Sequence, residues 1–149
     1  MSDSRVATGE HIRVVQFYMF DAIRDLLERL ISHDLSKLRP PEVKVFDEFT
    51  DKLAATTYGS DEYKMYLKAM KPALDHHYAN NRHHPEFFAN GIQGMNLIDI
   101  LQMLIDWKAD IVCHNDGNLL TSISKNQTRF GYGDELKKIL LNTVNYLGY

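Results

Sequence analysis

Apolar residues recur every three or four positions along most of this chain, and this spacing restricts the fold more than any other feature of the sequence. The period matches the 3.6 residues of a helical turn, whereas a half-buried strand alternates at every second position. Only four prolines and eight glycines interrupt the 149 residues, so long helices can form without a break. No strand pattern and no internal repeat competes. The sequence therefore predicts an all-α fold.

Breaks in the apolar spacing divide the chain into five or six helices in a single domain over residues 1–149, an ordinary size for one hydrophobic core. Pro41 suits the first turn of a helix, and Ser60 or Asp61 suits the start of another. Residues 126–133 have the composition of a polar connector. The stretch 96–113 is apolar on nearly every face, which predicts a buried central helix. The expected helices cover about residues 10–31, 41–55, 60–78, 96–113 and 134–147, with a short helical turn at Pro85.

Charge and composition exclude several classes of protein. The net charge is −3 with neutral histidines, so no overall positive field recruits a nucleic-acid polymer. The sequence contains no run of about 18 apolar residues, and the polar residues 1–10 lack the apolar stretch of a secretory signal. The single cysteine, Cys113, cannot form an internal disulfide, which fits a reducing compartment. We expect a cytoplasmic protein without a membrane segment.

Three segments carry side chains of the types that hold divalent metal ions. His11 lies near the start of the first predicted helix, and the pair His33-Asp34 lies at its end. Imidazole nitrogens and carboxylate oxygens are ligands that borderline transition metals prefer. Asp106 lies in the middle of the most apolar helix, where an unpaired carboxylate would cost several kcal/mol. It therefore needs either a cation, which is a metal ion or a nearby arginine or lysine, or a dense shell of hydrogen bonds.

Four of the seven histidines fall close together in the sequence. His76 and His77 end one predicted helix, and His83 and His84 precede Pro85 on a short connector. One histidine of each pair can reach a common point, and the residues alone leave open which one. The alternative is an exposed polar loop.

The order of these residues resembles the signature of the HD-domain superfamily of metal-dependent phosphohydrolases. That signature is a histidine, a His-Asp pair and a late aspartate on different helices, which correspond here to His11, His33-Asp34 and Asp106. Residues 33–37, His-Asp-Leu-Ser-Lys, are similar to the His-Asp-x-Gly-Lys element of several branches. Residues 83–86, His-His-Pro-Glu, are similar to the double-histidine segment of the cyclic-di-GMP phosphodiesterase branch, whose Gly-Tyr-Pro element is absent here. The match covers about residues 10–112, and the whole chain also resembles small proteins of phages and bacteria.

The resemblance implies an HD-domain-like fold with one or two divalent transition-metal ions, drawn from Mn, Fe, Co, Ni and Zn. Asp34 would bridge two such ions, which together activate a water and bind phosphoryl oxygens. Lys37 would act beside Asp34 in catalysis and neutralise a substrate phosphate as a point charge, and Arg82 would add a bidentate contact. The implied metal ligands are His11, His33, Asp34, His77 (or His76), His83, His84 and Asp106.

The implied activity is the hydrolysis of a phosphate ester by a metal-activated water. A small nucleotide is the expected substrate, because the chain is short and net acidic. Two alternatives remain open. The first is a di-iron oxygenase, since a minority branch of the superfamily uses additional histidines and the same lysine for oxidative cleavage. The second is a non-catalytic module, stabilised by metal, that binds a nucleotide or a partner protein.

Overall fold

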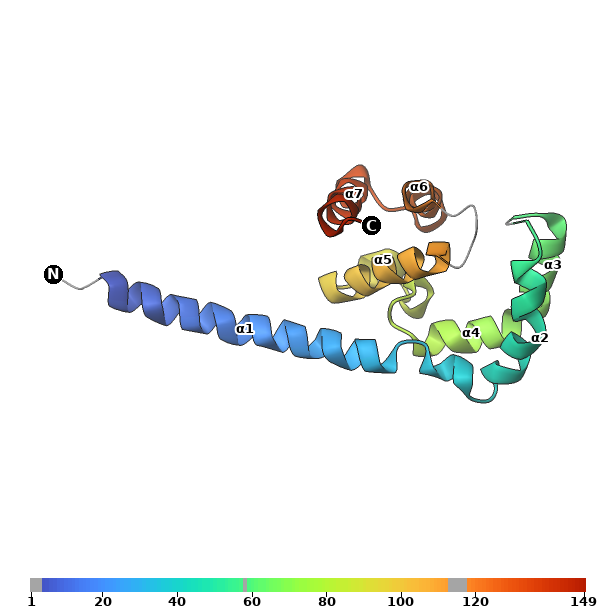
Figure 1. Cartoon of the computed structure of the whole chain (residues 1–149), viewed down its shortest axis with the longest axis horizontal. Coiled ribbons are helices and arrows are strands. Elements are labelled where there is room, and N and C mark those ends of the chain that lie inside the picture. The colour runs from blue at the N-terminus through green and yellow to red at the C-terminus, as the bar shows by residue number, and fades with distance from the viewer. Residues whose placement is uncertain (1–3, 58, 113–117) are drawn as a thin grey trace. The chain divides into compact units, whose positions relative to one another are not determined.

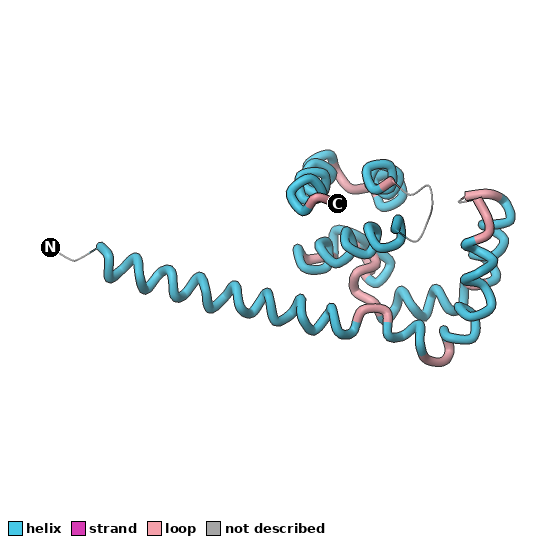
Figure 2. The backbone as a smooth tube through the Cα atoms, in the orientation of Figure 1, coloured by secondary structure: helices cyan, strands magenta, loops and turns pink. Residues whose placement is uncertain are grey.

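The structure is a computed structural model that describes residues 4–57, 59–112 and 118–149, and Cys113 lies outside these ranges. The described residues form seven α-helices and three short 3-10 helices, joined by turns and short loops and without a strand (Figure 1, Figure 2). The predicted all-α class is therefore confirmed. The chain divides into two units, Met1–His33 and Asp34–Tyr149, and each is described by itself. The single domain expected over residues 1–149 stays a prediction.

The first unit consists of one long helix, α1 (Ser4–Ser32). It begins earlier than the predicted residue 10, because no proline interrupts the preceding segment. An ion pair between Arg29 and Asp25, with Nε and Oδ2 3.1 Å apart, links neighbouring turns near its carboxyl end. No residue of α1 is buried, so this helix has no core of its own.

The second unit opens with the 3-10 helix η1 (Leu35–Leu38), followed by α2 (Glu42–Ala54), α3 (Asp61–Ala69) and α4 (Lys71–Asn80). Ser60 caps α3 as predicted, because its hydroxyl oxygen accepts a hydrogen bond from the backbone N–H of Tyr63 at 3.1 Å. The single helix predicted over residues 60–78 is instead two helices that meet at Met70. Pro72 accounts for the break, since proline has no N–H to donate to the preceding turn.

Two short 3-10 helices, η2 (Pro85–Phe87) and η3 (Gly91–Gly94), lead into α5 (Leu97–Val112), α6 (Leu119–Phe130) and α7 (Asp134–Leu147). Residues 126–130, predicted as part of a connector, are helical and complete α6. Asn118 caps this helix by accepting a hydrogen bond from the Thr121 N–H at 2.9 Å. Gly131 ends it in the left-handed conformation, with φ of 67°, which glycine adopts without a steric penalty.

The hydrophobic core of the second unit lies between α5, α6 and α7. The Trp107 ring stacks on the Phe130 ring, with centroids 6.3 Å apart and an angle of 4° between their planes. α5 is less buried than predicted, because Leu97, Ile105 and Val112 are exposed in the second unit by itself. The buried core side chains are Ile92, Met103, Leu104, Trp107, Leu119, Ile123, Tyr132, Leu140 and Val144.

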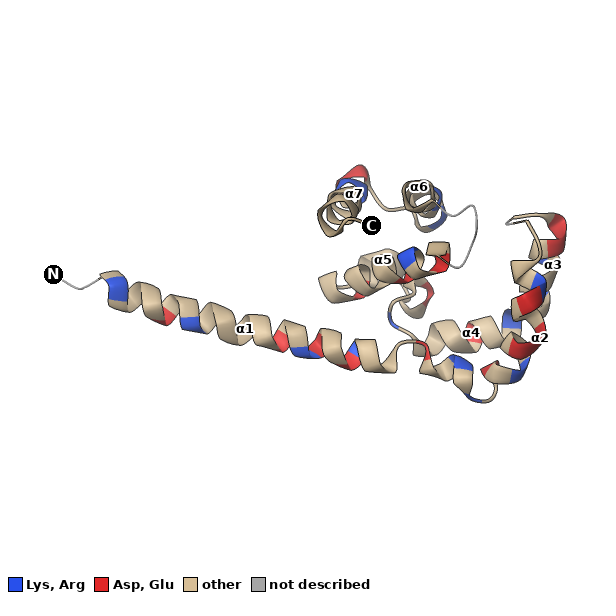
Figure 3. Ribbon diagram, viewed as in Figure 1, with Lys and Arg blue, Asp and Glu red and all other residues tan. Residues whose placement is uncertain are grey.

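The charged residues do not separate by sign. Both α2 and α3 carry acidic and basic side chains (Figure 3). Among the described helices, none combines the length and the apolar character that a membrane span requires.

Replacing Tyr132 by phenylalanine tests the α6–α7 corner of the core. The Tyr132 hydroxyl donates a hydrogen bond of 2.6 Å to the buried backbone carbonyl of Ile123. Since the variant leaves this carbonyl without its partner, we expect Tyr132→Phe to lower the free energy of unfolding by about 1–2 kcal/mol in urea denaturation. Tyr146→Phe, at an exposed position on α7, should change it by less than about 0.5 kcal/mol. Equal stabilities for the two variants would contradict this role.

Candidate metal centre

Asp34 is the first residue of the second unit, and its backbone has the left-handed conformation, with φ of 56° and ψ of 13°. Aspartate tolerates this conformation better than most residues. The turn places Asp34 directly before η1, so Lys37 lies one turn later on the same side. The Lys37 ammonium is 2.6 Å from Asp34 Oδ2. The other carboxylate oxygen, Oδ1, remains directed at the histidines.

Three imidazoles converge on Asp34. His77 lies on α4, His83 on the turn after it, and His84 at the start of η2. The Nε2 atoms of His77 and His83 are each 3.3 Å from Asp34 Oδ1. The Nε2 atoms of His77 and His84 are 3.0 Å apart. The short connector between α4 and η2 thus places His83 and His84 beside His77.

These spacings are the ones expected of ligands around one metal ion. Two donors bound about 2.1 Å from an ion at angles of 90–110° lie about 3.0–3.4 Å from one another. One oxygen of Asp34 and one nitrogen each of His77, His83 and His84 all lie within 4.8 Å of one another. This largely buried His/Asp group could therefore hold a metal ion.

Asp106 extends the group from the middle of α5. Its Oδ2 is 3.9 Å from His83 Nε2, and its side chain is 13% exposed. Asp34, His83 and Asp106 also have donor atoms within 4.8 Å of one another. Two overlapping donor sets thus share Asp34 and His83. We call the five residues Asp34, His77, His83, His84 and Asp106 the metal-site group.

The carboxylate of Glu42, at the first turn of α2, is completely buried and orients His77. His77 Nδ1 lies 2.9 Å from Glu42 Oε2, which also accepts a hydrogen bond from the Ser36 hydroxyl at 3.0 Å. Because a carboxylate only accepts hydrogen bonds, this contact places a proton on Nδ1, and Nε2 would then offer its lone pair to a bound ion. Nε2 faces Asp34 and His84.

The contacts of Glu42 also distinguish His76 from His77, two candidate ligands that the sequence left open. Its other oxygen, Oε1, is 2.6 Å from His76 Nδ1. The His76 ring is 41% exposed, and within the described residues His76 belongs to neither donor set. His77 is therefore the candidate ligand, and His76 supports the carboxylate that holds it.

The local charges keep the group ready to bind a cation. Burial would raise the pKa of Asp34, but hydrogen bonds from His77 and His83 and the charge of Lys37 hold that pKa well below its usual range. Burial and the neighbouring His83 and His77 lower the pKa of His84 to about 3. Asp34 is thus ionised and His84 neutral near pH 7, which are the protonation states that metal ligands need.

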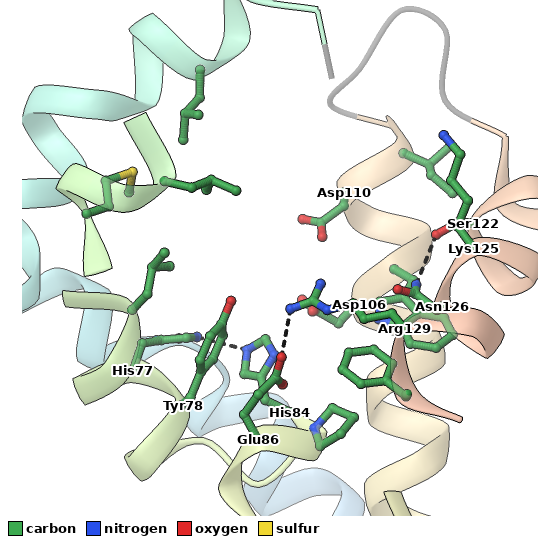
Figure 4. A pocket seen from close by; sticks show the side chains of 18 of the residues that line it. His77, Tyr78, His84, Glu86, Asp106, Asp110, Ser122, Lys125, Asn126 and Arg129 are labelled. Carbon is green, nitrogen blue, oxygen red and sulfur yellow. Dashed lines mark hydrogen bonds and ion pairs between the residues drawn. The ribbon is translucent and has the colours of Figure 1, made fainter. Parts of the chain in front are cut away.

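A cavity of about 570 Å³ adjoins the metal-site group within the second unit. This volume is in the range of small-molecule sites. His77 and His84 line one side of it, and Asp106 faces them from α5 (Figure 4). Lys37 also lines this cavity, as the sequence-based role in substrate binding requires. Its apolar wall is formed by Phe46, Leu53, Tyr63, Leu67, Met70 and Leu74.

Two predicted ligands belong to the first unit. His11 lies seven residues after the start of α1 and His33 directly follows its last residue, so an unbroken helix keeps them about 33 Å apart along its axis. While α1 is continuous, His11 cannot share an ion with His33 of the same chain. His33 is bonded to Asp34 and remains a predicted ligand.

Arg82 does not have the position that the sequence-based role in substrate binding requires. Its Nε and Nη2 donate to the two oxygens of Asp99 at 3.1 and 3.0 Å. Asp99, in the first turn of α5, is fully buried and also accepts a hydrogen bond from the Asn96 N–H at 2.9 Å. The bidentate pair ties the residue before His83 to the start of α5. Arg82 thus supports the metal-site group from outside the cavity.

Residues 1–147 match the family of unknown function DUF5662, so the chain belongs to that family. No curated protein and no solved structure matches the chain.

Removing the charge of Glu42 tests its orienting role. We expect Glu42→Gln to raise the dissociation constant for Co²⁺ about 10–100-fold, because the His77 ring loses the charged acceptor that fixes its tautomer. The measurement is a titration that follows the visible absorption of bound Co²⁺.

Glu48→Gln is the matched control, since Glu48 lies on the same helix with an exposed side chain that pairs with Lys52. Circular dichroism should show equal helix content in both variants. An unchanged dissociation constant in folded Glu42→Gln would contradict the role of Glu42.

Proposed function

We propose that this member of DUF5662 is a metal-dependent phosphohydrolase of the HD-domain type that hydrolyses a small phosphate ester. The observation that carries the proposal is the position of the metal-site group at the wall of a cavity of small-molecule size, beside Lys37. The ordered His-Asp and late-aspartate residues of the sequence support the same activity. A nucleotide is the first substrate class to test.

The donor set fits a divalent transition metal. Three imidazole nitrogens with two carboxylates suit Mn, Fe, Co, Ni or Zn better than Mg or Ca, which prefer oxygen ligands throughout. When bound, such an ion lowers the pKa of a water towards neutrality and polarises phosphoryl oxygens. Because Asp34 belongs to both donor sets, its carboxylate is the group that two ions would share.

The chain's own residues would position the substrate. The Lys37 ammonium lines the cavity 2.6 Å from Asp34, where it can neutralise one phosphoryl oxygen while the carboxylate keeps it in place. Burial would lower the pKa of Lys37, but the Asp34 carboxylate raises it, so the ammonium stays charged. The apolar wall, which includes Phe46 and Leu67, would exclude water and contact the uncharged part of an ester such as a nucleobase.

A nucleotide panel tests the activity. Full-length protein loaded separately with Mn²⁺, Fe²⁺, Co²⁺, Ni²⁺ or Zn²⁺ should release phosphate from at least one member of a set of mono-, tri- and cyclic nucleotides. Elemental analysis should find one or two ions per chain. Bound metal without phosphate release on any substrate would overturn the proposal. Oxygen consumption by the iron form would instead support the oxygenase alternative.

Asp34→Asn separates catalysis from binding. This change removes the charge of a residue that both donor sets share, so we expect turnover to fall by more than about 100-fold. Changing a residue that only orients a ligand has a smaller effect, about 10–100-fold. Asp75→Asn is the matched control, because Asp75 is exposed on α4, where it pairs with Lys71. Turnover that survives in Asp34→Asn would place the reaction elsewhere.

A further inference from the structure

α6 forms one wall of the cavity, and this wall carries an arginine to which the sequence analysis gave no role. Arg129 lies in the last turn of α6, just before Phe130, whose ring stacks on Trp107. This packing, together with the end of α6 at Gly131, fixes the backbone position of Arg129. Figure 4 shows Arg129 directed into the cavity, opposite Tyr78 and His84.

In the structure Arg129 pairs with an acid from the histidine segment. Its Nη2 lies 2.7 Å from Oε1 of Glu86, which is two residues after His84 on η2 (Figure 4). Tyr78, next to the candidate ligand His77, lines the same cavity. The ion pair therefore crosses the cavity beside the metal-site group.

This ion pair is of a kind that another anion can replace. The side chains of Arg129 and Glu86 are 53% and 32% exposed, and ion pairs with this exposure contribute little free energy. A phosphoryl group offers a guanidinium several charged oxygens in bidentate geometry, which makes stronger hydrogen bonds than a half-exposed carboxylate. Glu86 thus holds Arg129 in the place where a substrate anion would need it.

We propose that Arg129 binds the phosphoryl group of the ligand that occupies this cavity, and that Glu86 is the internal carboxylate which that group displaces. The inference rests on the proposed function for the identity of the anion. It names a contact on α6 that is separate from Lys37 and replaces the role predicted for Arg82. Arg129 and Lys37 both line the cavity, so one ligand can contact both charges.

The alternative is that the ion pair only holds α6 against η2. The two hypotheses predict different changes in anion affinity when each charge is removed. If Glu86 competes with the ligand, removing its charge strengthens anion binding, whereas removing the charge of Arg129 weakens it. If the pair is only a structural tie, both changes loosen the same contact and act in the same direction.

The experiment measures the binding of inorganic phosphate to full-length, Mn²⁺-loaded protein by calorimetry. We expect Arg129→Gln to raise the dissociation constant about 10-fold or more, and Arg129→Lys to give an intermediate value, because lysine keeps the charge without the bidentate geometry. Glu86→Gln should lower the dissociation constant about two- to fivefold. The double variant should resemble Arg129→Gln.

Lys138→Gln and Glu135→Gln make the same charge changes at exposed positions on α7, outside the cavity, and should leave phosphate binding unchanged. Weakening by both Arg129→Gln and Glu86→Gln, or no change in either, would overturn the inference. The opposite shifts without phosphate release from any ester would retain this inference and remove the proposed hydrolase activity. If the protein releases phosphate from an ester but neither variant changes its phosphate affinity, the proposed hydrolase activity stands and this inference fails.

Discussion

The hydrogen bond between His77 and the buried Glu42 carboxylate is the contact on which the polar centre of the second unit depends. It joins α2 to α4 and fixes the rotation of one imidazole, so Nε2 faces Asp34. His84 then meets that same nitrogen from the connector. The cost of burying Glu42 is offset because its oxygens have His76, His77 and Ser36 as partners.

Local patterns predicted the helical class and most of the elements, but not every boundary. Ser60 and the helix ending at Leu147 follow from capping and periodicity. The break at Met70 depends on where the ring of Pro72 falls in the helix, and the periodic pattern does not register it. No helix was predicted over any part of α6, although Asn118 and Gly131 carry the cap signals of a helix.

For the metal-site group, residue chemistry was a better guide than sequence position. The clustered histidines and the apolar surroundings of Asp106 indicated a cation, and the structure brings these residues together with Asp34. The position of His11 was less predictable, although a helix predicted over residues 10–31 already implies a long separation from His33. Glu42 and Arg129 could not be found, because the contacts that define them join segments more than 30 residues apart.

The buried acids of this centre bear on how long the chain survives in a cell. Asp34 and Asp106 lie close together with little exposure to water, so their two negative charges repel each other and a bound cation would relieve that repulsion. A cation that binds only the folded chain would stabilise it by mass action, and proteases would remove open chains sooner when that cation is scarce. The abundance of this protein would then follow the supply of the cation even at a constant rate of synthesis.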